Sequence, residues 1–169
     1  MRYILTLLFA LSFTNAFSQS SFIQYKDTTN KFSINIPIGW RYGVNKNVPD
    51  LKLIAARSAT DSSDHPHENF NLNIFEKKNS SLEKEYEKLI NALTSTNNFE
   101  LLKKDTIVIN EQPYKWFIEK HKAADIWITN YVFITYKNQK TYILTLVSPT
   151  NDFDKYEHLF TEIAKSMIL

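Results

Sequence analysis

Residues 126–148 have the sequence IWITNYVFITYKNQKTYILTLVS, in which two long apolar runs are separated by a short polar turn. Both runs are rich in β-branched and aromatic side chains, which favour strands. The segments YVFITY and YILTLV are apolar on both strand faces, which is typical of central strands that are covered on both sides. Asn138-Gln139 between them favours a tight turn. The stretch therefore predicts an antiparallel hairpin, residues 126–137 and 141–148, at the centre of a β-sheet.

Strand patterns also extend outward from this hairpin. Phe32, Ile34 and Ile36 alternate with polar residues, which predicts a half-buried strand. Pro37 ends that strand because it lacks a backbone donor, and we expect Trp40 beyond it to plug one end of the core. Further strands are predicted over residues 22–26, 51–58, 70–76, 100–109 and 114–121.

Two amphipathic helices complete the pattern. Apolar residues at helical spacing predict one helix over residues 82–96, where Ser80-x-x-Glu83 resembles a capping box, and a second over residues 152–167. Strands joined by short turns, together with two helices, predict an α+β fold: helices packed on a central antiparallel β-sheet of about seven strands. Residues 19–169 are expected to form one domain.

The N-terminus has the layout of a secretory signal peptide over residues 1–18. Arg2 precedes an apolar run from Tyr3 to Phe13, and small or polar residues follow up to Ser18. The alternative is a retained membrane anchor, but the apolar run is shorter than the roughly 20 residues that span a bilayer. We therefore expect an exported protein, periplasmic or secreted, with no membrane span after cleavage.

The composition excludes several kinds of site. Gly39 and Gly43 are the only glycines, which leaves no material for a glycine-rich phosphate loop. The chain has no cysteine, so it has no disulfide, thiolate metal site or cysteine nucleophile. Lys+Arg number 20 against 18 Asp+Glu, with the signs interleaved, so we expect no nucleic-acid partner.

Several short motifs, taken in order, resemble those of the PsbP/Mog1/DUF1795 superfamily. They are NKFSINIPIGW at residues 30–40, the predicted helix and hairpins that follow, YILTLVS at residues 142–148, and the apolar stripe from Phe153 to Phe160 with TEIAKS at residues 161–166. The resemblance implies an αβα sandwich of the Mog1/PsbP type. It also implies a non-catalytic binding or scaffold module, because relatives that include photosystem II subunits, a Ran-binding protein and envelope proteins share partner binding rather than catalysis. The expected partner is another protein or an envelope component.

The richest cluster of potential metal ligands lies in the loop DSSDHPHE, residues 61–68. His65 and His67, two residues apart in an extended segment, would point to the same side, and Asp64 and Glu68 could add oxygen ligands. Such a set suits zinc, copper or nickel. The alternative is a solvated polar loop, since most of its residues favour turns. The other histidines, His121 and His158, are expected at the surface.

Three functional hypotheses follow from the sequence. The first is an exported binding or scaffold module without a catalytic site, whose oligomeric state the sequence leaves open. The second is a metal-binding protein that uses the loop of His65 and His67, with zinc as the possible cofactor. The third is a carrier for a small apolar ligand, because the 12 Phe, 9 Tyr and 3 Trp could line a pocket between sheet and helix. No catalytic motif is found, so no enzyme is expected.

Overall fold

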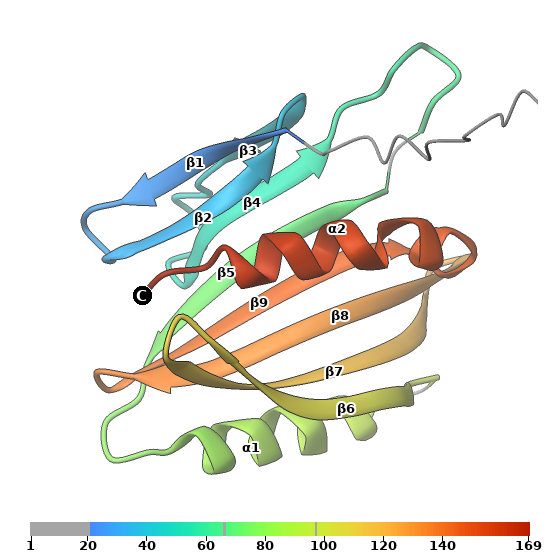
Figure 1. Cartoon of the computed structure of the whole chain (residues 1–169). Helices are drawn as coiled ribbons and strands as arrows, with labels where there is room; N and C mark the ends of the chain where they lie inside the picture. Colours follow the sequence, from blue (N-terminus) through green and yellow to red (C-terminus); the bar gives the residue numbers. More distant parts are fainter. Residues whose placement is uncertain (1–20, 66, 97) are drawn as a thin grey trace, which may run out of the picture.

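The computed structural model describes residues 21–65, 67–96 and 98–169; the predicted signal peptide lies outside these residues. Seven strands form one antiparallel sheet in the order β3-β4-β5-β9-β8-β7-β6, and β1 and β2 form a separate hairpin (Figure 1). The elements are β1 (Phe22–Asp27), β2 (Phe32–Pro37), β3 (Trp40–Gly43), β4 (Leu51–Arg57), β5 (Asn69–Glu76), α1 (Leu82–Thr94), β6 (Glu100–Ile109), β7 (Gln112–Ala123), β8 (Ile126–Lys137), β9 (Lys140–Pro149), a 3₁₀ turn (Thr150–Asp152) and α2 (Phe153–Lys165). The predicted α+β class with a seven-stranded antiparallel sheet is confirmed.

The predicted central hairpin is β8 and β9, which lie in the middle of the sheet with β5 and β7 on either side. Adjacent residues of these strands contact different helices. Tyr131 of β8 lies against Phe153 of α2, with ring centroids 6.3 Å apart. The next residue of β8, Val132, pairs with Phe117 of β7, whose ring lies 6.1 Å from that of Tyr86 in α1. Since neighbouring strand residues point to opposite faces, α1 and α2 cover opposite faces of the sheet.

The larger core lies on the α2 face. Alternate residues of β2, β5 and β9 point into it, so the period-2 pattern of the sequence becomes a continuous apolar layer under α2. Trp40 is buried and packs against Phe70, with ring centroids 6.1 Å apart, which confirms the predicted plug. The residues that form the layer include Phe32, Ile34, Ile36, Phe70, Leu72, Ile74, Tyr142, Leu144, Leu146, Phe160 and Ile163.

The structure also corrects details of the sequence analysis. Trp40–Gly43 forms β3, an edge strand that the sequence did not predict because four residues are too few to show a period. The N-cap of α1 is Ser81, not Ser80: its side chain accepts a hydrogen bond from the Lys84 backbone N–H. Glu83 forms an ion pair with Lys115 of β7 instead of closing a capping box.

Within the described residues, no helix combines the length and the apolar character needed to cross a membrane.

Candidate functional site

The loop that holds the predicted metal ligands is organised by Arg57, the last residue of β4. Its guanidinium donates to both Asp64 oxygens, at 2.6 and 2.7 Å, and its Nε donates to Glu68 Oε2 at 2.7 Å. The register of β4 and β5 explains the arrangement, since the Arg57 backbone N–H also donates to the Glu68 carbonyl at 2.9 Å. Both predicted carboxylate ligands are therefore already engaged by a cation of the same chain.

The electrostatics of this loop follow from the arginine. Hydrogen bonds from Arg57, and then from Thr60, hold the pKa of Asp64 below its ordinary value, and the two carboxylates raise the pKa of Arg57. Glu68 is buried, whereas His65 and His67 are exposed. Across residues 21–65, 67–96 and 98–169, no group of three His, Cys, Asp or Glu side chains is placed to hold a metal. A zinc site in this loop stays a prediction.

Arg57 carries no motif that marks it in the sequence as part of this loop. The available signal was an arginine at the end of one predicted strand and an acidic residue just before the next, because a hairpin places such residues opposite each other. The pair could have been found by aligning the two strands, whereas Asp64, seven residues after Arg57, is brought in by the loop itself.

The space between sheet and helix α1 contains a small cavity, lined mostly by apolar side chains with Glu119, Asn130 and Thr145 among them. Glu119 of β7 is fully buried there; its carboxylate accepts a hydrogen bond from Asn130 Nδ2 at 2.5 Å and contacts His121 Nδ1 at 3.0 Å. His121 is thus half-buried rather than at the surface, while His158 is exposed as expected. The cavity measures about 90 Å³, against about 300–1,000 Å³ for typical ligand pockets. It gives no support to the apolar-carrier hypothesis.

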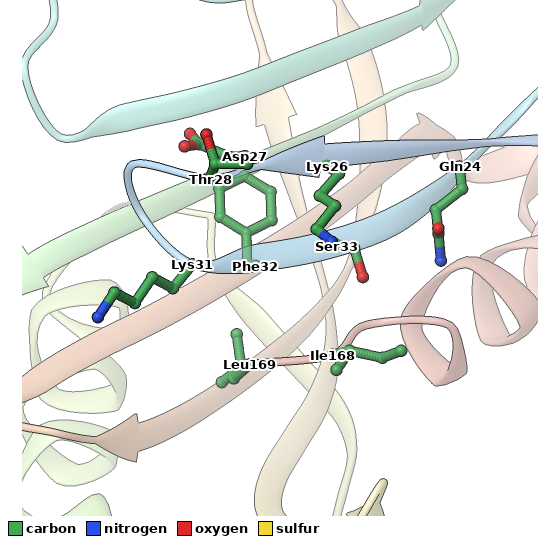
Figure 2. A pocket seen from close by; sticks show the side chains of 9 residues that line it. All are labelled: Gln24, Lys26, Asp27, Thr28, Lys31, Phe32, Ser33, Ile168 and Leu169. Carbon is green, nitrogen blue, oxygen red and sulfur yellow. The ribbon is translucent and has the colours of Figure 1, made fainter.

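A larger groove lies between the β1–β2 hairpin and the C-terminal residues of the chain (Figure 2), and it is named here the C-terminal groove. Its volume is about 510 Å³, within the range of ligand pockets. It is lined by Gln24, Lys26, Asp27, Thr28, Lys31, Phe32, Ser33, Ile168 and Leu169.

The walls of the C-terminal groove are fixed by backbone pairing. Ser33 N–H donates to the Ile168 carbonyl and Ile168 N–H donates to the Ser33 carbonyl, both at 2.9 Å, so Ile168 is tied to β2 by an isolated antiparallel bridge. Met167 is buried in the core, and Asn110 Nδ2 donates to its carbonyl at 2.8 Å. The C-terminal wall of the groove is therefore fixed by β2, by the core and by Asn110 of the β6–β7 turn.

The surface of the C-terminal groove combines apolar and basic groups. Ile168 is 49% exposed although it is held by two backbone hydrogen bonds, whereas Phe32 of β2 is buried in the core. Lys26 and Lys31 are exposed. In Figure 2 the Lys31 side chain extends away from the hairpin, whereas Lys26 lies near Ser33.

Comparison with known proteins identifies the family of this fold. The sequence model of the PsbP family matches residues 20–169. No curated protein sequence matches the chain.

Among solved structures, cyanobacterial PsbP (CyanoP) from Synechocystis sp. PCC 6803 is 18% identical with a TM-score of 0.65, over 94% of this chain and 98% of that one. LpqN of Mycobacterium tuberculosis, described as involved in cell envelope biogenesis, is 9% identical with a TM-score of 0.63, over 88% and 90%. The Ran-binding protein Mog1p of Saccharomyces cerevisiae is 11% identical with a TM-score of 0.61, over 88% and 95%. At these identities the three structures share the fold with this chain.

Proposed function

Because this chain belongs to the PsbP family, we propose that it is an exported, non-catalytic binding module that engages a partner protein or envelope component through the C-terminal groove. The groove carries the proposal: it is preformed, of ligand-pocket size, and presents the exposed apolar side chain of Ile168 from a segment fixed by two backbone hydrogen bonds. A rigid apolar contact limits the entropy lost on binding.

The family and its structural relatives support a binding role. The solved structures with this fold include a Ran-binding protein and a protein involved in cell envelope biogenesis. Because fold alone does not carry function, the partner and the surface used by this chain are proposed from its own residues. Export is proposed from residues 1–18, and determining the N-terminus of the protein from an envelope or culture fraction tests it, with Gln19 expected as the first residue.

Site-directed photo-crosslinking tests the groove as the working surface. A photoreactive phenylalanine derivative replaces Gln24 or Lys26, both exposed in the C-terminal groove, and separately Lys103, exposed on the distant edge strand β6. We expect the same adduct from both groove positions, reproducibly identified by mass spectrometry, and its absence from position 103. Equal adducts at all three positions, or none at the groove positions, would contradict the proposed surface.

A further inference from the structure

A second hollow adjoins the C-terminal groove and is named here the basic hollow. It lies between the β1–β2 turn, residues 29–31, and the β8–β9 turn, residues 137–140, and has a volume of about 630 Å³. Lys31 and Leu169 line both the groove and the hollow, so the two spaces meet around the end of the chain. A ligand that follows the groove past Leu169 therefore enters the basic hollow.

Lysines make up most of the charged side chains that line the combined surface. Four lysines, Lys26, Lys31, Lys137 and Lys140, line it together with one acidic side chain, Asp27. The Asp27 carboxylate is already used within its turn, where it accepts hydrogen bonds from the Asn30 backbone N–H at 2.8 Å and from Asn30 Nδ2 at 2.7 Å. The one acidic side chain of the lining is thus directed at its own turn.

The lysines differ in how far their charge is offset. Lys140 Nζ lies 3.0 Å from Glu76 Oε1, and Lys137 Nζ donates to the Leu169 backbone oxygen at 2.9 Å. Within the described part of the chain, neither Lys26 nor Lys31 forms an ion pair. The junction therefore carries excess positive charge in a chain whose full-length net charge is only +2, and positive charge gathered at one concave surface attracts an anionic partner.

From this charge and the apolar groups beside it, we propose that the C-terminal groove and basic hollow together bind an acidic polypeptide segment with apolar side chains between its carboxylates. The inference rests on the proposed function and specifies its partner. A small anion would contact the lysines of one hollow and leave the exposed side chain of Ile168 without a contact. An extended segment crosses both spaces, placing carboxylates against the lysines and apolar side chains on Ile168.

Fluorescence anisotropy with a labelled peptide of alternating Glu and Leu tests this proposal directly. We expect binding that weakens as NaCl is raised, because exposed charges are screened. The double variant Lys26→Glu, Lys31→Glu should weaken binding by about tenfold or more, since two attractive contacts become repulsive. The matched control Lys84→Glu, Lys103→Glu carries the same charge change on exposed residues of α1 and β6 and should leave the affinity nearly unchanged.

Further probes separate the alternatives. Equal binding of a Lys-Leu peptide, or an unchanged affinity of the Lys26→Glu, Lys31→Glu variant, would overturn the inference. So would equally tight binding of oligo-glutamate, which has no apolar side chains, or displacement of the peptide by phosphatidylglycerol vesicles at the same charge concentration. Circular dichroism melts of each variant verify folding, and Lys26→Glu alone serves if the double variant melts early.

The photo-crosslinking experiment distinguishes the inference from the proposed function. If adducts form at Gln24 and Lys26 but map to a neutral or basic segment of the partner, the acidic-segment proposal fails and the binding module stands. If no adduct forms there, the proposed function fails whatever the peptide does.

Discussion

At the residue scale, Arg57 determines what the loop of residues 61–68 can do. The sequence singled out Asp64, His65, His67 and Glu68 as possible metal ligands. It did not indicate that a residue outside the cluster would bind both carboxylates, since the contact depends on the strand register and on the path of the loop. Spacing along a chain predicts which ligands could lie together, but it does not predict that an arginine from another segment forms ion pairs with them.

Replacing Arg57 tests this assignment through stability. Arg57→Leu leaves the buried Glu68 carboxylate without its partner, and we expect a loss of about 2–3 kcal/mol in unfolding free energy, somewhat less than for fully buried pairs because Arg57 is partly exposed. Chemical denaturation of the variant and the wild type measures this difference in unfolding free energy. The double variant Arg57→Leu, Glu68→Leu should recover much of the loss, whereas Arg41→Leu, on the exposed part of β3, should have little effect.

The same variant has a defined pH signature. The pKa of Asp64 is lowered in the folded state, so its contribution to stability is present above the unfolded value of about 4 and is lost as pH falls below it. The stability difference between wild type and Arg57→Leu should therefore shrink as the pH is lowered from about 5 towards 2. A difference that is constant with pH would contradict the assigned ion pair.

Zinc affinity tests the same loop in a different way. If the loop binds zinc through His65 and His67, Arg57 competes for the carboxylates, so Arg57→Gln should bind zinc more tightly than wild type. Calorimetric titration with zinc chloride measures the affinity, and the variant His65→Ala, His67→Ala should lose it. Identical titrations for all three proteins would remove the metal hypothesis.

At the element scale, long segments with a clear period were predictable and short ones were not. β8, β9 and α2 follow directly from apolar runs or stripes of at least eight residues. β3 has four residues and ends at Gly43, so no period could reveal it. The sequence also could not show that β1 and β2 form a hairpin separate from the main sheet, because the choice between joining the main sheet and packing beside α2 depends on tertiary contacts.

The start of α1 allows a precise test of capping. Ser81→Ala removes the side-chain acceptor of the Lys84 N–H, and we expect a loss of about 1 kcal/mol in unfolding free energy. Glu83→Ala should cost less, because Glu83 is exposed and only forms a surface pair with Lys115. The reverse order in a denaturation experiment would favour the capping box at Ser80 and Glu83.

At the scale of the whole molecule, the candidate site could not be predicted because its parts are far apart in the chain. The C-terminal groove joins residues 24–33 to residues 168–169, and the basic hollow adds the β8–β9 turn. None of these segments contains a known ligand-binding motif, and their lysines appear in the sequence as ordinary turn and strand-end residues. The pairing of Ser33 with Ile168 and the hydrogen bond from Lys137 to the Leu169 oxygen bring them together.

The backbone pairing of Ser33 with Ile168 can be tested by substitution at Ile168. Ile168→Pro removes the N–H that donates to the Ser33 carbonyl, at a cost of about 1 kcal/mol for the hydrogen bond. Since the side chain is half exposed, little core packing is lost. We expect amide exchange at Ser33 to accelerate while exchange in β8 and β9 is unchanged, because the opening is local, and peptide binding in the groove to weaken. Ile168→Ala keeps both backbone bonds and is the matched control: it should leave exchange at Ser33 near the wild-type rate, and equal acceleration in the two variants would mean that the side chain, not the backbone tie, holds the groove.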